Sequence, residues 1–254
     1  MPKFRTFWVA LQFLTILPTP AFKTFSAKDE EKAVYWYPVV GAIVGSIVVA
    51  IFLLCYWLTN EIMLSVLLAI LANILITGAL HIDGLADSAD ALLSSKSERK
   101  AKLLIMKDSR IGTMGALVLI FYLLLKWELL SLLPFELIWK SLFLEPILGK
   151  FFIFLVMKQL PYVSINSKLL TRFQNIIPNW WYGVSFGFIF TFPFLVYPFN
   201  TAAWVIVISL AGTALFMRWA KKSLGGATGD IYGTTQELVG LLIPLACFIA
   251  VKTI

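Results

Sequence analysis

The chain has few of the residues that usually build metal centres. Its 254 residues include two cysteines, Cys55 and Cys247, and one histidine, His81. Both cysteines fall inside apolar runs, which argues against a disulfide framework and against a Cys-based metal site. A single histidine also argues against a zinc site of the usual His/Cys kind. Any metal in this chain is therefore expected to bind to oxygen ligands.

Charge is scarce as well. Charged residues make up 14% of the chain and hydrophobic residues 60%, with a mean hydropathy of +0.87. Soluble domains have about 25% charged and 45–50% apolar residues. The composition therefore predicts an integral membrane protein. The formal charge of +7 does not indicate nucleic acid, because the basic residues lie mainly between the apolar runs.

Apolar runs of about 20 residues are long enough to cross a bilayer as helices. They predict an all-α, polytopic helical bundle with about seven transmembrane helices, forming one membrane-embedded domain over residues 1–254. The segment Phe7 to Phe22 is also apolar but contains Pro18 and Pro20, so it is expected to be interfacial or re-entrant, or to span. It lacks a small-residue cleavage site, which argues against a removable signal peptide. The predicted spans are 36–58, 62–80, 111–133, 135–157, 180–198, 200–218 and 232–251.

The distribution of basic residues predicts the orientation. Seven spans with a cytoplasmic amino terminus put segments 1–35, 81–110, 158–179 and 219–231 on one face, and these segments hold most of the lysines and arginines. The opposite face holds only Lys126 and Lys252. The positive-inside rule then predicts a cytoplasmic amino terminus and an external carboxyl terminus for a multi-pass protein of the cell inner membrane. Segments 81–110 and 219–231 would carry the active site at the cytoplasmic face.

Three aspartates follow the second predicted span. Asp83, Asp87 and Asp90 are spaced i, i+4, i+7, so a helix would point all three in one direction. Like charges arranged in this way repel, and a divalent metal that holds a phosphate would relieve the repulsion. The alternative is a solvated loop that happens to be acidic, but neighbouring alanines favour a helix.

Two further motifs share the same predicted face. In the first, Lys107 and Arg110 are suited to phosphate oxygens, Asp108 to a metal or a proton, and Gly112 and Gly115 to an anion at a helix start. The alternative is a basic loop against anionic lipid headgroups. The second motif is a glycine turn with candidate ligands Gly226, Thr228 and Asp230, and a flexible turn between two spans is its alternative.

Three ionisable residues have open roles. His81 is either interfacial or catalytic. Glu145 and Lys150 lie within the predicted span 135–157, where such groups are costly. They either pair with one another or line the substrate route.

Taken in order, the motifs resemble the cobalamin synthase family, the adenosylcobinamide-GDP ribazoletransferases. The resemblance covers nearly the whole chain, and Ile16 and Lys150 depart from the arginines typical of the family. The strings that carry it are Leu11-Gln12-Phe13-Leu14-Thr15, Tyr37-Pro38-Val39-Val40-Gly41-Ala42-Ile43-Val44-Gly45, His81-Ile82-Asp83-Gly84-Leu85-Ala86-Asp87, Met106-Lys107-Asp108-Ser109-Arg110-Ile111-Gly112 and Gly225-Gly226-Ala227-Thr228-Gly229-Asp230.

The resemblance implies that α-ribazole or its 5′-phosphate attacks adenosylcobinamide-GDP and releases GMP. For that reaction the residues predict Mg²⁺ bound by Asp83, Asp87 and Asp108, with Asp90 and Asp230 as a further ligand or the base. Lys107 and Arg110 would hold the GMP phosphate. Substrate-binding roles are also expected for His81, Gly112, Gly226 and Thr228. Membrane lipids are expected partners and nucleic acid is not, while the oligomeric state stays open.

Two other functions remain as alternatives. CDP-alcohol phosphotransferases also place spaced aspartates on membrane helices, but the arginine of their motif is missing after Ala86. A proton- or cation-coupled transporter would use embedded acids. The acids here cluster at one face, and the predicted spans show no obvious inverted repeat.

Overall fold

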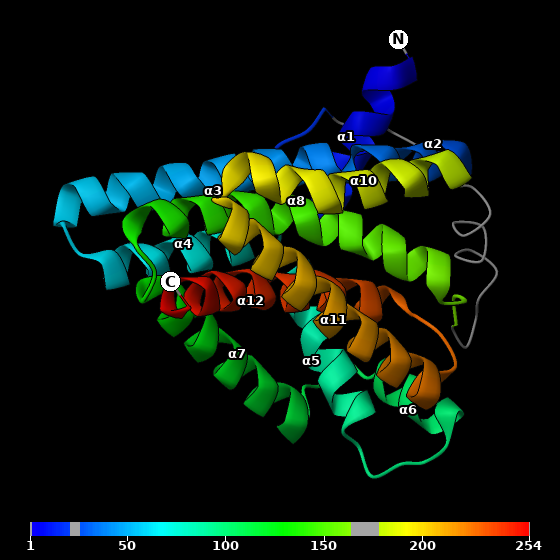
Figure 1. Ribbon diagram of the computed structural model, residues 1–254. Coiled ribbons are helices and arrows are strands. Elements are labelled where there is room, and N and C mark those ends of the chain that lie inside the picture. Colours follow the sequence, from blue (N-terminus) through cyan, green and yellow to red (C-terminus); the bar gives the residue numbers. More distant parts are fainter. Residues whose placement is uncertain (1, 21–25, 164–177, 254) are drawn as a thin grey trace.

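The computed structural model describes residues 2–20, 26–163 and 178–253. Within these residues the protein is all-α and contains no named strand. The basic residues expected in 21–25 and 164–177 lie outside the described residues. The helices are α1 (Pro2–Leu14), α2 (Ala27–Ala33), the short 3-10 helix η1 (Val34–Trp36), α3 (Tyr37–Thr59), α4 (Ile62–Ile76), α5 (Leu80–Leu92), α6 (Arg99–Ile105), α7 (Thr113–Ser131), α8 (Phe135–Gln159), α10 (Asn179–Val196), α11 (Phe199–Leu224) and α12 (Gly229–Lys252) (Figure 1).

Each predicted span is occupied by a helix, which confirms the all-α membrane fold. The number of spans differs from the prediction. By length and hydropathy, four helical stretches among the described residues qualify as spans: Asp29–Thr59, α7, α11 and α12. Helices α4 and α5 qualify only together and are bent by 89°. Neither α8, which carries Glu145 and Lys150 in its interior, nor α10 qualifies, so the predicted seven becomes four or five.

The amino-terminal helix is too short to cross a bilayer. At 1.5 Å per residue, the 13 residues of α1 extend about 20 Å, against a hydrocarbon core of about 30 Å. The apolar stretch that begins at Phe7 therefore does not span as one continuous helix, because α1 ends at Leu14.

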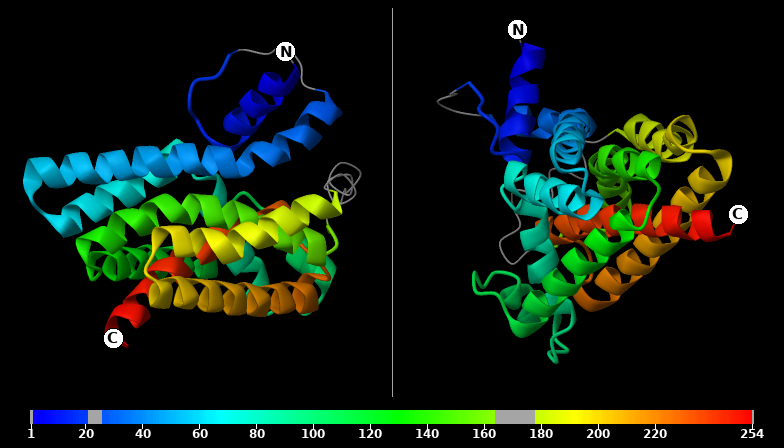
Figure 2. Two further views of the ribbon diagram at one scale, coloured as in Figure 1. Left: turned by 45° about the horizontal axis from the view of Figure 1, so that its top comes forward. Right: turned by 90° about the vertical axis from the view of Figure 1, so that its left-hand side faces the viewer.

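Helix α8 lies at the centre of the bundle. It packs against α3, α10 and α12, and almost all of its residues from Ser141 to Met157 are buried (Figure 2). Gly41 and Gly45 of α3 face the α8 backbone at Pro146 and Phe143 so closely that a Cβ at either glycine would collide with it. These two glycines therefore permit close contact between α3 and α8.

One end of the bundle collects the polar segments. Residues 77–112, 160–163 and 225–229, which we call the polar end, lie at the right and lower right of Figure 1. A parallel bridge pairs Tyr162 with Ala227, with Val163 N–H to Ala227 C=O and Ala227 N–H to Pro161 C=O both at 2.9 Å. The segments that carry the three motifs therefore lie at one end of the bundle, and the position of this end at the cytoplasmic face stays a prediction.

Candidate active site

Helix α5 carries the three aspartates and begins after a sharp turn. Gly78 and Ala79 have φ of +57° and +59°, in the left-handed region that glycine adopts easily and alanine rarely. This turn ends α4 four residues before the predicted end of the span at residue 80 and directs α5 along the polar end. The helix predicted beneath Asp83, Asp87 and Asp90 is confirmed.

Two glycines let α5 cross α12 at close range. A Cβ at Gly84 would lie 2.9 Å from the carbonyl oxygen of Asp230, and a Cβ at Gly233 would lie 3.2 Å from that of His81. The Thr234 hydroxyl lies 3.0 Å from the Gly84 carbonyl oxygen and 2.7 Å from the Ser88 hydroxyl. Backbone contact therefore fixes the first turn of α12 against the acidic helix.

The crossing brings a fourth carboxylate to the aspartates. Burial raises the pKa of Asp87 from its ordinary value of 3.8 to about 7, assisted by the charges of Asp83, Asp230 and Asp90 in that order. Asp87 lies on α5, which is not long or apolar enough to cross a membrane by itself. The contact between Gly84 and the Asp230 backbone places the first turn of α12, which carries Asp230, against the helix that carries Asp83 and Asp87. From the sequence, Asp230 was related to the other aspartates only because its motif was predicted on the same membrane face.

Asp90 faces the start of α7 instead of joining this group. Its Oδ2 accepts the N–H of Gly112 at 2.7 Å, and its Oδ1 accepts the N–H of Gly115 at 2.8 Å. The N–H groups at this helix start therefore do bind an anion, as expected, but the anion is a side chain of α5. A carboxylate at a helix amino terminus is stabilised by the backbone donors and by the helix dipole.

Asp108 pairs with its neighbour Arg110. Arg110 Nη2 lies 2.7 Å from Asp108 Oδ2, and the Arg110 backbone N–H donates to Oδ1 at 3.1 Å. The side-chain hydrogen bond from Arg110 lowers the pKa of Asp108 to about 2. Lys107 and Arg110 are both exposed. No described contact joins Asp108 to the α5 carboxylates, so the structure does not bring the predicted ligand trio together.

The glycine motif forms the entry to α12. Gly225 has φ +86° and ends α11, while Gly226 packs against the Pro161 carbonyl so tightly that a Cβ would collide with it. The Thr228 hydroxyl caps α12 by accepting the Ile231 N–H at 3.3 Å, and it donates to Asp230 Oδ2 at 3.2 Å. Thr228 thus positions the Asp230 carboxylate at the crossing with α5.

The donor chemistry of the site is that of a hard cation. Asp83, Asp87 and Asp230 offer only oxygen, and their mutual repulsion favours a positive ion between them. As the side chains stand, no group of three or more His, Cys, Asp or Glu residues within 2–20, 26–163 and 178–253 is positioned to hold a metal. Side-chain rotation would have to bring the carboxylates together around an ion.

Comparison with known proteins shows the family. The family model described as cobalamin-5-phosphate synthase matches residues 6–248. This chain belongs to that family. An adenosylcobinamide-GDP ribazoletransferase of Desulfitobacterium hafniense is 33% identical over 252 residues, covering 98% of each chain. One of Herpetosiphon aurantiacus is 37% identical over 240 residues, covering 92% of each. No solved structure matches.

In this cobalamin-5-phosphate synthase family member, His81 lies inside the bundle. It is buried, and its Nε2 lies 2.6 Å from Lys150 Nζ of α8. The His81 side chain therefore faces α8 inside the protein, and the choice between an interfacial and a catalytic role stays open. Lys150 is also buried, and the two residues line a cavity of about 10 Å³ together with Gln236 and Glu237 of α12.

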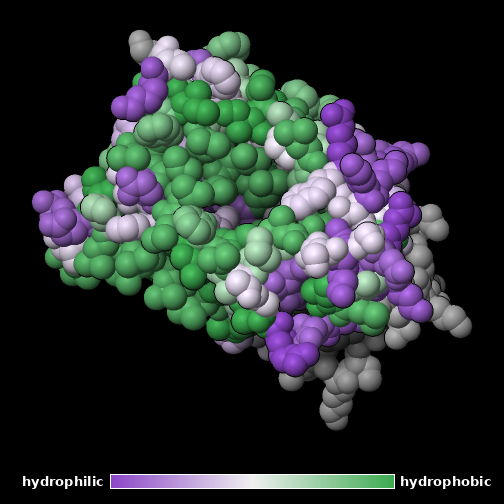
Figure 3. All heavy atoms as spheres, turned by 90° about the horizontal axis from the view of Figure 1, so that it is seen from below, coloured by the Kyte–Doolittle hydropathy of each residue, from purple (hydrophilic) through white to green (hydrophobic). Residues whose placement is uncertain are grey.

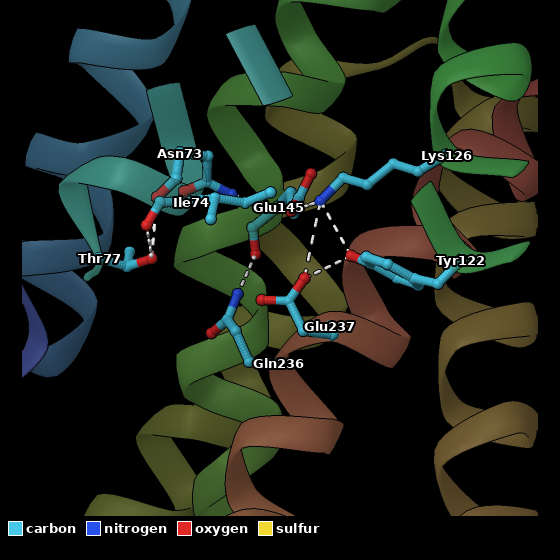
Figure 4. A network of polar contacts seen from close by, with 8 residues as sticks. All are labelled: Asn73, Ile74, Thr77, Tyr122, Lys126, Glu145, Gln236 and Glu237. Atoms are coloured by element: carbon cyan, nitrogen blue, oxygen red, sulfur yellow. Dashed lines mark hydrogen bonds and ion pairs between the residues drawn. The ribbon is translucent and has the colours of Figure 1, made fainter. Parts of the chain in front are cut away.

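A buried ionic cluster holds α7, α8 and α12 together (Figure 4). Lys126 forms an ion pair with Glu145 and lies 3.9 Å from Glu237, and Glu237 accepts a hydrogen bond from Tyr122. Lys126 Nζ also lies 3.1 Å from the Tyr122 hydroxyl, and Gln236 Nε2 donates to the Glu145 carbonyl oxygen at 3.3 Å. We call Tyr122, Lys126, Glu145 and Glu237 the ionic cluster.

The cluster bears on two sequence-based interpretations. Lys126 is 2% exposed, so its side chain lies inside the protein, and its assignment to the face opposite the basic loops stays a prediction. Glu145 pairs with Lys126 of α7 and not with Lys150 on its own helix. The signal that sequence reasoning missed was a lysine four residues after Tyr122 within a mostly apolar run, since a lysine buried there needs an acidic partner.

Proposed function

We propose that this protein is an adenosylcobinamide-GDP ribazoletransferase that acts at the cytoplasmic face of the cell inner membrane. Membership of the cobalamin-5-phosphate synthase family over residues 6–248 supports this activity. The observation that carries the site assignment is the crossing of α5 with α12, which gathers carboxylates from two of the three motifs. In the reaction, a ribazole hydroxyl oxygen bonds to the phosphorus attached to the corrinoid, the bond from that phosphorus to the GMP oxygen breaks, and the hydroxyl proton passes to a base.

The metal proposal begins with Asp83 and Asp87. Mg²⁺ prefers carboxylate oxygens and keeps several waters, and it would neutralise charge on the diphosphate. The proximity of Asp230 supports its inclusion as a third ligand or as the base for the hydroxyl proton. Asp108 is a weaker candidate than the sequence suggested, because both of its oxygens bond to Arg110.

The remaining residues divide into positioning and phosphate-binding groups. Asp90 is engaged with the start of α7, so it supports the position of α5. The exposed Lys107 and Arg110 lie just before α7 and are suited to the departing GMP phosphate. Gly112 and Gly226 have backbone roles, at the Asp90 cap and at the Pro161 contact.

The test is a coupled assay on purified protein in detergent. Adenosylcobinamide-GDP and α-ribazole, or its 5′-phosphate, should yield GMP and the corrinoid product in equal amounts, and EDTA should stop both. Asp83→Asn and Asp87→Asn should each lower turnover by at least about 100-fold, the scale of a lost electrostatic contact at a reacting group. Glu98→Gln is the matched control, because Glu98 is exposed at the same polar end.

Each outcome bears on a different part of the proposal. Wild-type turnover of both aspartate variants at limiting Mg²⁺ would remove the metal assignment while leaving the activity. Release of CMP from CDP-diacylglycerol and an alcohol, with no GMP from the corrinoid substrate, would replace the activity by that of a CDP-alcohol phosphotransferase. Product formation in detergent, where no compartments exist, argues against a transporter.

A further inference from the structure

An apolar groove lies on the side of α5 opposite the aspartates. It has a volume of about 310 Å³ and is lined by residues of α5, α7, α11 and α12. From α5 it uses Leu85, Ser88 and Leu92, which helical geometry places away from Asp83 and Asp87. The volume is at the lower end of the range of about 300–1,000 Å³ found for ligand sites.

The lining indicates an apolar occupant. The hydroxyl groups among the lining residues already have partners: Ser88 and Thr234 lie 2.7 Å apart, and Tyr122 bonds to Glu237 of the ionic cluster. The groove therefore offers mainly hydrocarbon walls, and its hydroxyl groups are already bonded within the protein.

The groove opens to the side of the protein that faces lipid. Helices α7, α11 and α12, which form three of its walls, all qualify as spans. At its rim Leu125 is 50% exposed and Trp219 41%. Figure 3 shows a hollow within the hydrophobic part of this face, with hydrophilic side chains gathered at one end. Because this opening faces the hydrocarbon core of the bilayer, the apolar group that can enter it is the acyl chain of a lipid.

Two lysines lie next to residues that line the groove, Leu92 and Trp219. Lys102 of α6 is buried, and its Nζ donates to the carbonyl oxygen of the lining residue Leu92 at 3.4 Å. Lys222 is exposed and follows Trp219 by three residues, so both lie on one face of α11. Within the described ranges, no carboxylate lies within ion-pairing distance of either ammonium group.

We infer that this groove binds one acyl chain of an anionic phospholipid whose phosphate contacts Lys102 and Lys222. A zwitterionic lipid fits the groove equally well, but it carries no net charge to compensate the two lysines. Helix α5 then has carboxylates on one face and a bound lipid on the other, so the lipid supports the helix that bears the aspartates.

Fluorescence quenching tests the site without any use of the transferase activity. The protein is reconstituted in phosphatidylcholine vesicles with increasing brominated phosphatidylglycerol, and separately with brominated phosphatidylcholine. The chain has nine tryptophans, so the signal of Trp219 is the difference between the wild type and Trp219→Phe. One lysine near an anionic headgroup raises the affinity for that lipid about fivefold. Two lysines therefore predict that brominated phosphatidylglycerol reaches half-maximal quenching at a mole fraction about 25-fold lower than brominated phosphatidylcholine does.

Matched variants locate the site. Lys222→Gln should reduce the preference about fivefold. Leu125→Phe narrows the groove and should reduce quenching of Trp219 by the anionic lipid. Leu124→Phe should leave it unchanged, because Leu124 is 51% exposed on the same helix and does not line the groove.

Three results would overturn the inference. The first is half-maximal quenching at the same mole fraction of the two brominated lipids. The second is an equal effect of the Leu124 and Leu125 variants together with no effect of Lys222→Gln. The third is protection of Trp219 from both lipids with a doubled mass in sedimentation, which would show that a second copy of the chain covers the groove.

Discussion

Removing the Asp90 carboxylate should detach the start of α7 from α5. Asp90→Ala removes the acceptor of two backbone N–H groups, at 2.7 and 2.8 Å. A hydrogen bond to a charged group contributes about 1.5–3 kcal/mol, so the free energy of unfolding should fall by about 3 kcal/mol or more. For a chain of this size that corresponds to a melting temperature lower by about 6–12 °C. Asp90→Asn keeps one acceptor oxygen and should lose roughly half as much.

Thermal unfolding in detergent and hydrogen exchange measure this effect. The amides of Gly112 and Gly115 should exchange at least about tenfold faster in Asp90→Ala, since 1.4 kcal/mol is a factor of ten. Asp83→Asn is the control on the same helix, and it should keep or raise stability because it relieves repulsion with Asp87. If Asp90→Ala melts at the wild-type temperature and both amides exchange at wild-type rates, the reasoning about this cap is wrong.

Three further predictions concern the carboxylates, the ionic cluster and the helix crossing. In metal-free protein, the pKa of Asp87 is about 7 in the folded state and 3.8 in the unfolded chain. Protonation of Asp87 therefore stabilises the fold fully below pH 3.8, and this stabilisation is lost as the pH rises through 7. Asp87→Asn should flatten that part of the melting profile by about 1–2 kcal/mol, after discounting for solvent around a partly exposed group. Lys126→Met leaves two buried acids, Glu145 and Glu237, without their shared cation and should cost about 3–5 kcal/mol in denaturant titration, and adding Glu145→Leu should recover part of that loss. An undiminished loss in the double variant would contradict the pairing. Gly84→Ala puts a methyl group 2.9 Å from the Asp230 carbonyl oxygen and should lower turnover by tenfold or more, whereas Gly187→Ala, in open space, should retain wild-type activity.

The local features of the fold were predictable from the sequence. Apolar runs located the helices, and the i, i+4, i+7 spacing identified α5 as a helix with an acidic face. The interruption between α4 and α5 was not predictable, because Ala79 takes a left-handed conformation that its residue type does not indicate. The count of spans differs because α8, with Glu145 and Lys150 in its interior, and α10 do not qualify as spans by length and hydropathy.

The partners of the site residues depend on contacts between distant segments. Asp90 and Gly112 are 22 residues apart, and Thr234 reaches Gly84 across 150 residues. Sequence patterns identified these residue types but not which acid meets which helix start. The sequence grouped Asp108 with Asp83 and Asp87, whereas the structure pairs it with Arg110, its neighbour along the chain.

The ionic cluster has a consequence for how the chain enters the membrane. Lys126 lies within α7, five residues before its end at Ser131, where an unpaired lysine is costly during insertion through the translocon. Its counter-ion Glu145 is synthesised 19 residues later, on α8. Only three residues, 132–134, connect α7 to α8. The hairpin of α7 and α8 should therefore leave the translocon as one unit, with the lysine and the glutamate already paired. Glu237 joins them only when the last helix has been synthesised, so the biogenesis of this region is complete only at the end of translation.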